Sequence, residues 1–230
     1  MVCRLSAEVF FLILDASDML CIASLRYTSR NFYNLCVEYL EYARRRLLRY
    51  YVDDSDLLWE LLDDFQAVIG GPAALAFVLL DLASLPNGLD VFVAGEDLGN
   101  MTRILKETHL LRHVPHRRPP GPSPRNIRET IAFTTPTNRY IYLHGSVDEC
   151  ALLPLVSILP TYYINYVARH TFGVGYPALT FAGLALTCDP HMRSTWRGCM
   201  YSLTSPLQDR FHTAVRPSHL PGFEIGRAHV

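Results

Sequence analysis

The chain has 230 residues, of which 50% are hydrophobic and 19% charged, and its formal net charge is −1 at pH 7. This composition is typical of a globular protein with a sizeable core and excludes an intrinsically disordered chain. The near-zero net charge gives no strong signal for binding nucleic acid or an anionic membrane surface.

Six cysteines are present, and their spacing matches no zinc-binding pattern. No run of about 18 apolar residues predicts a membrane span, and no signal peptide stands out. We therefore expect reduced, buried thiols and no membrane contact, and we predict a cytoplasmic or nuclear protein.

Residues 1–65 are predicted to form a helical segment. Apolar residues at helical spacing over 9–14, a break at Ser17–Asp18 and a second apolar run over 19–25 indicate two short helices, followed by a long amphipathic helix over 32–51. The short helices, with Leu-x-x-Glu near the start and Ser-Arg-x-Phe near the end, resemble an F-box. This resemblance implies docking of a Skp-type adaptor of a cullin ubiquitin ligase, whereas a plain helical cap on the next domain explains the same pattern.

Residues 67–93 contain the motif around which the chain is organised. The pattern predicts a short strand, a Gly70–Gly71 turn, an apolar helix from Pro72 and a second strand over 89–93 that carries Asp90. A strand that delivers two glycines to a helix start presents free N–H groups to a phosphate. Gly70 and Gly71 are therefore candidate nucleotide-binding residues. Asp90 is a candidate catalytic residue that could hold the metal ion accompanying such a phosphate.

The second half of the chain predicts a β-hairpin and another helix. Strands are expected over 130–134 and 139–143, and a Pro- and Arg-rich loop over 112–125 precedes them. Pro160 is expected to start a helix on which Thr161 and Asn165, four residues apart, share one face. Both are candidate nucleotide-binding residues beside Asp90, and local hydrogen bonding within packed helices is the alternative.

Taken together, the motifs resemble a known family. They comprise, in order, the F-box-like start, Gly-Gly-x-Ala-Ala-Leu-x-Phe, Leu-Asp-Val-Phe-Val, Arg-x-Ile-x-Leu, Pro-Thr-Tyr-Tyr-Ile-Asn, Tyr176–Thr180 and Trp196–Gly198. This set resembles the nucleotidyltransferase-like proteins expanded in mushroom-forming fungi. The resemblance implies an α+β fold with a mixed β-sheet flanked by helices, preceded by the F-box-like helical segment.

The chain departs from the family pattern at the positions that matter for chemistry. The family places Asp-x-Asp on the second strand, where two carboxylates on one face hold two divalent metals for attack on a nucleotide α-phosphate. Here Gly88 takes the first position, Tyr142 takes the expected position of a third carboxylate, and Pro72 replaces a Ser. We therefore predict a catalytically inactive, degenerate domain with a binding or interaction role, no cofactor, and a nucleotide as ligand.

Three alternatives remain open at this point. An active nucleotidyltransferase would use Asp90 with Glu96 or Asp97 and Mg²⁺, and an F-box-type protein would act as a substrate adaptor of a ubiquitin ligase. A diverged gene copy without a retained role fits as well. The expected organisation is a helical segment over 1–65 and a nucleotidyltransferase-like domain over 66–210. Residues 224–230, EIGRAHV, match a reading frame of a common sequencing-library adapter and are predicted to be an artefact.

Overall fold

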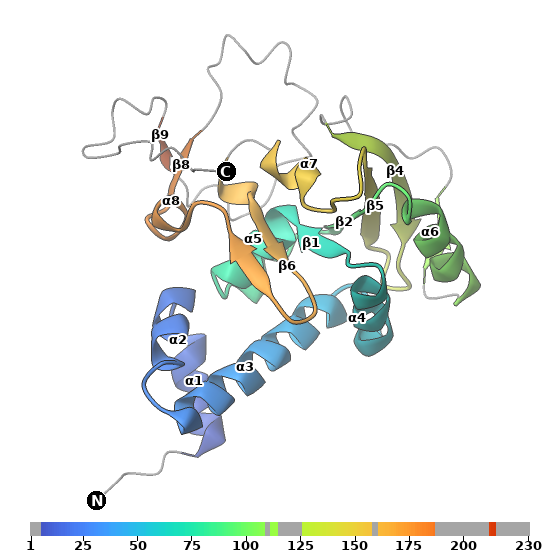
Figure 1. The fold of residues 1–230 in the computed structure, drawn as a ribbon. Helices are drawn as coiled ribbons and strands as arrows, with labels where there is room; N and C mark the ends of the chain where they lie inside the picture. Colours follow the sequence, from blue (N-terminus) through green and yellow to red (C-terminus); the bar gives the residue numbers. More distant parts are fainter. Residues whose placement is uncertain (1–5, 109–110, 115–125, 158–160, 187–211, 215–230) are drawn as a thin grey trace, which may run out of the picture.

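The computed structural model describes residues 6–108, 111–114, 126–157, 161–186 and 212–214. Within them the chain has an α+β fold, in which helices flank a seven-stranded mixed sheet (Figure 1), and this confirms the predicted fold class at that level. The segments Trp196–Gly198 and 224–230 lie outside the described residues. None of the helices that the structure describes has the length and apolar content needed to cross a membrane.

Four helices open the fold, and the spacing of apolar residues predicted the first three of them. They are α1 (Ala7–Asp15), α2 (Met19–Leu25), α3 (Arg30–Arg49) and α4 (Ser55–Asp64). Each begins after a Ser or Asp whose side chain accepts a hydrogen bond from a backbone N–H of the first turn, at Ser6, Asp18, Ser29 and Asp54. Such caps satisfy N–H groups that the helix itself leaves unpaired, so they fix where each helix starts. Figure 1 shows α1, α2 and α3 grouped below the sheet, with α3 running from this group towards α4.

The sheet contains seven strands in the order β3-β4-β5-β2-β1-β6-β7. Their bounds are β1 (Val68–Gly70), β2 (Gly88–Val93), β3 (Arg112–His113), β4 (Ile127–Thr134), β5 (Tyr140–Ser146), β6 (Asn165–Val167) and β7 (Phe172–Val174). All neighbouring pairs are antiparallel except β2 and β5, which run parallel. The predicted glycine turn, the strand that carries Asp90 and the hairpin are therefore all confirmed.

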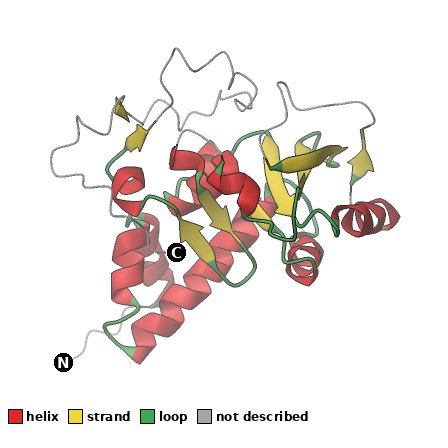
Figure 2. Ribbon diagram, turned by 45° about the horizontal axis from the view of Figure 1, so that its top comes forward, coloured by secondary structure: helices red, strands yellow, loops and turns green. Residues whose placement is uncertain are grey.

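The remaining elements lie around this sheet (Figure 2). They are α5 (Gly71–Val78), η1 (Leu82–Ser84), α6 (Leu98–Glu107), α7 (Leu153–Val156), η2 (Thr161–Tyr163), α8 (Pro177–Phe181) and the parallel strands β8 (Leu184–Leu186) and β9 (His212–Ala214). Helix α5 is apolar on all sides, and seven of its eight residues are buried. A helix without a polar face is stable only inside the protein, so α5 sits at the centre of the core.

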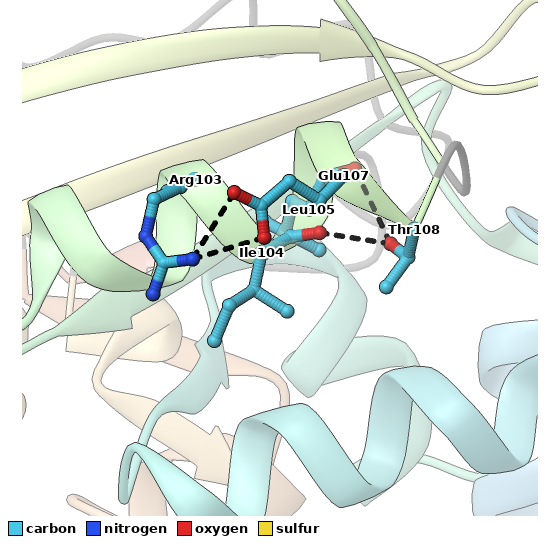
Figure 3. A network of polar contacts seen from close by, with 5 residues as sticks. All are labelled: Arg103, Ile104, Leu105, Glu107 and Thr108. Atoms are coloured by element: carbon cyan, nitrogen blue, oxygen red, sulfur yellow. Dashed lines mark hydrogen bonds and ion pairs between the residues drawn. The ribbon is translucent and has the colours of Figure 1, made fainter.

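Helix α6 carries its polar contacts on its outer face. Arg103 donates to both carboxylate oxygens of Glu107, at 3.1 and 2.9 Å, and the Thr108 hydroxyl donates to the carbonyl of Ile104 at 3.0 Å (Figure 3). The Arg103–Glu107 pair is well exposed to solvent. Exposed pairs of this spacing contribute roughly 0.3–0.5 kcal/mol, so apolar packing against β5 is what holds α6 in place.

The end of α3 is joined to the sheet by polar contacts. The Arg139 guanidinium donates to the Tyr50 carbonyl and lies over the Tyr50 ring, 3.6 Å from its centroid. Thr137 donates to the Tyr51 carbonyl at 3.1 Å, and the Tyr51 hydroxyl donates to the Pro86 carbonyl at 2.8 Å. These bonds connect α3 to the β4–β5 turn and to the turn before β2. Apolar residues of the N-terminal helices and of the sheet form one continuous core.

Candidate functional site

The Gly70–Gly71 turn brings the start of α5 against the second strand. Gly71 has φ +62°, a left-handed conformation that glycine adopts without strain. A Cβ atom on Gly71 would lie 2.8 Å from Oδ2 of Asp90. Glycine is therefore required here for two reasons: the backbone is left-handed, and the Asp90 carboxylate leaves no room for a Cβ atom. Among the residues that the structure describes, no side chain caps α5, which has Pro72 in its first turn.

Asp90 lies at the centre of the sheet and faces this turn. Its β2 position pairs with Gly70 of β1 on one side and with Tyr142 of β5 on the other. The residue is 6% exposed. A buried carboxylate requires a partner, because leaving it unpaired costs several kcal/mol.

His144 is that partner, and sequence reasoning missed it. Its Nε2 lies 3.0 Å from Oδ1 of Asp90, and its Nδ1 lies 2.9 Å from the hydroxyl of Thr130. His144 is fully buried, and it sits directly opposite Thr130 on β4 and Phe92 on β2. An ionised carboxylate only accepts hydrogen bonds, so Nε2 carries the proton. In a neutral imidazole Nδ1 then accepts from the Thr130 hydroxyl.

Aromatic rings occupy the rest of this sheet face. The rings of Tyr140 and Tyr142 stack with centroids 6.2 Å apart, those of Tyr142 and His144 lie 6.5 Å apart, and Phe92 stacks on His144 at 4.8 Å. A Cβ atom on Gly88 would lie 2.9 Å from the edge of the Tyr142 ring. The tyrosine ring thus lies over Gly88, in the space that a carboxylate at position 88 would enter.

The negative charge around Asp90 is low. Within the described part of the chain, no group of three His, Cys, Asp or Glu residues is arranged to hold a metal ion. Glu96 lies in the loop after β2, where it lines a separate cleft, and Asp97 precedes α6. Burial, together with the charge of Asp90, raises the pKa of the Tyr51 and Tyr163 hydroxyls, so neither phenol supplies an anion at neutral pH.

The predicted helix that carries Thr161 and Asn165 is wrong. Thr161–Tyr163 form the single turn η2, and Asn165 is the first residue of β6, where it pairs with Val174. The two side chains therefore do not share a helix face, although both are buried. The Asn165 amide donates to the Tyr162 carbonyl at 2.6 Å, and its Oδ1 has no hydrogen bond to any residue that the structure describes.

Most of the predicted residues nevertheless lie around the glycine turn, because strand pairing and the packing of η2 bring them there instead of a shared helix face. Gly71 contacts Asp90, and Gly70 pairs with it. Ile69 of β1 lies opposite Val167 of β6, so Asn165 lies at the end of β6 nearest the glycine turn. The turn η2, which carries Thr161, packs against α5. A polar signal for His144 was present in the sequence, since it alternates with Tyr140 and Tyr142 on one strand face.

A cleft lies beyond the C-terminal ends of β2 and β5. This cleft of about 550 Å³ is lined by Gly95, Glu96, Arg128, Val147, Asp148, Glu149 and Cys150. Oδ1 of Asp148 accepts from the Cys150 N–H at 2.9 Å and from the Ser146 hydroxyl at 2.8 Å. These hydrogen bonds, that of Cys150 first, lower the pKa of the Asp148 carboxyl below its ordinary value.

Replacing Ser146 with alanine is expected to raise the pKa of Asp148 towards 3.8, because one hydrogen bond to the charged form is lost. The bonds favour the ionised carboxylate, so their stabilisation is present above the unfolded pKa and is lost as the pH falls through the folded one. A carboxyl NMR titration measures the shift. Ser157→Ala removes a hydroxyl that bonds Asn126 and is the control. An unchanged Asp148 titration in Ser146→Ala would contradict the assignment.

Comparisons with protein-family models, with curated proteins and with solved structures found no match.

Proposed function

We propose that the chain contains a degenerate nucleotidyltransferase-like domain that does not transfer nucleotidyl groups and acts as a binding or interaction module. The glycine turn between β1 and α5, faced by a carboxylate on β2, supports the likeness in fold. The observation that carries the proposal is the environment of Asp90. One oxygen of this carboxylate is held by His144, Tyr142 lies opposite Asp90 on β5, and Gly88 lies two positions before it on β2.

Charge explains why this environment disfavours metal-dependent transfer. Two divalent cations a few ångströms apart need several anionic ligands to offset their repulsion and their loss of water. Asp90 provides one negative charge, and the hydrogen bond from His144 already engages it. A nucleotide would instead be held by the backbone N–H groups at Gly70–Gly71 and by the buried side chains of Thr161 and Asn165, without Mg²⁺.

The test measures nucleotide binding and transfer as a function of metal. We expect calorimetric titrations with nucleoside triphosphates to give the same affinity in EDTA as in Mg²⁺ or Mn²⁺, and no nucleotidyl product to form. Asp90→Asn should leave binding unchanged. Product formation that requires Mg²⁺ and is lost in Asp90→Asn would replace this proposal with that of an active transferase.

A second function is favoured by the apolar surface of α1 and α2. Val9, Leu12, Ile13 and Leu20 are exposed, with Leu12 at 68%. Exposed apolar side chains grouped on adjacent helices are typical of a protein-binding surface, and they lie in the F-box-like segment. The partner that this segment implies is a Skp-type adaptor.

Co-purification of the chain with a Skp-type adaptor tests this second function. We expect Leu12→Asp to abolish co-purification. Val156→Asp, at a side chain that is 64% exposed on α7, should leave it intact. Absence of the adaptor from the wild-type preparation would remove this function.

A further inference from the structure

Three side chains on adjacent strands form a continuous series of hydrogen bonds. This arrangement involves neither a metal nor a nucleotide. It runs from Thr130 on β4 through His144 on β5 to Asp90 on β2, with the separations of 2.9 and 3.0 Å given above. The carboxylate fixes the tautomer of the imidazole, and the imidazole nitrogen on the other side is then a base directed at a hydroxyl. A hydroxyl, a base and a group that orients the base, in this order, is the arrangement of a nucleophilic site.

The two ends of this series differ in access. Asp90 and His144 are buried, whereas Thr130, the residue that carries the hydroxyl, is half-buried. A β-bulge lies beside Thr130, because the pairing of β4 with β5 shifts between Ile127 and Glu129. Arg128 is the residue that the pairing skips, and it carries an exposed cation two positions before Thr130. Bulges leave a backbone N–H outside the ladder and are common beside active sites.

We propose that Thr130 is the nucleophile of a site that hydrolyses small carboxylic esters, with His144 as its base and Asp90 as the positioning residue. The inference goes beyond the proposed function, since it involves no nucleotide and no metal. The aromatic rings of Phe92 and Tyr142 pack beside His144 and hold the position of its ring. Arg128 and its backbone N–H stabilise the oxyanion.

The reaction balances without an added reactant other than water. The Thr130 oxygen bonds to the ester carbon while its proton moves to Nδ1 of His144. The bond to the leaving alkoxide then breaks, and the alkoxide takes that proton from His144. Water attacks the acyl-threonine by the same route, its proton passing through His144 back to the Thr130 oxygen, and the carboxylic acid leaves. Asp90 keeps Nε2 protonated throughout.

The test uses a fluorophosphonate probe on the full chain, followed by peptide mass spectrometry. We expect labelling on Thr130 in the wild type and in Thr130→Ser, and none in Thr130→Val, which keeps the β-branched shape. Thr134→Val is the matched control, because it removes a hydroxyl of the same strand that donates to the Arg112 carbonyl instead of to His144. An unlabelled wild type, or equal labelling of Thr130→Val, would overturn the proposal.

Hydrolysis of p-nitrophenyl acetate tests the role of Asp90. Asp90→Asn is expected to lower kcat about 100-fold with KM unchanged, because the imidazole loses the group that fixes its tautomer. A merely structural role of Asp90 would leave kcat per folded molecule unchanged. That result would remove Asp90 from the site.

Discussion

Replacing His144 with phenylalanine is expected to lower the free energy of unfolding by about 3 kcal/mol. Phenylalanine keeps a ring of similar size against Phe92, so little packing is lost. What is lost is the donor to the buried Asp90 carboxylate, whose other oxygen faces Gly71. Urea denaturation monitored by circular dichroism measures the change.

Two further variants separate this effect from a general cost of changing a histidine. His170→Phe alters a second His–Asp pair, with Asp63 at 3.5 Å, but both of its side chains are more than half exposed. Its effect should stay within about 0.5 kcal/mol. Adding Asp90→Asn to His144→Phe removes the buried charge and should restore at least about 1 kcal/mol. If His144→Phe and His170→Phe lower the free energy of unfolding by equally small amounts, the hydrogen bond from His144 does not stabilise the buried Asp90 carboxylate.

Replacing Gly71 with alanine is expected to cost about 2–3 kcal/mol. A left-handed φ disfavours any residue with a Cβ, and the new atom would lie 2.8 Å from Oδ2 of Asp90. The carboxylate cannot easily move away, because His144 holds its other oxygen. Under the proposed function, the affinity for nucleotide should fall in the same variant, since the turn that would hold the phosphate is displaced.

Gly99 provides the control for this substitution. It lies in α6, and apart from its chain neighbours and the backbone of its own helix, no heavy atom of the described residues lies within 4 Å of the position that its Cβ would take. Gly99→Ala is therefore expected to stabilise the protein by up to about 1 kcal/mol through its higher helix propensity. The contrast of sign between the two variants is the diagnostic result, and thermal unfolding measures both. Destabilisation of similar size in Gly99→Ala would show that the effect is not specific to the turn.

Local patterns in the sequence were sufficient for the part of the site that local structure builds. Strand β1, the glycine turn and α5 are contiguous, and β2 follows after one further turn, so the proximity of Gly71 and Asp90 could be predicted. The caps at Asp18 and Ser29 likewise mark helix starts at the breaks that the sequence shows.

The missed features depend on contacts between distant parts of the chain. His144 meets Asp90 only because β2 and β5 pair in parallel with a particular register, across 54 residues. The helix expected after Pro160 fails for a similar reason. The Ile164 N–H closes one turn onto the Thr161 carbonyl, and Asn165 then pairs with β7. Strand pairing outweighs the modest helix preference of so short a segment.

The hydrogen bonds between the end of α3 and the sheet determine how cooperatively the protein unfolds. Because Tyr50 and Tyr51 hold the β4–β5 turn and the approach to β2, and one apolar interior spans both regions, the N-terminal helices should not melt separately. Heating should give a single calorimetric transition. Limited proteolysis should release neither the N-terminal helices nor the sheet as a stable fragment. A ligand that binds to either region should raise the unfolding temperature of the whole protein.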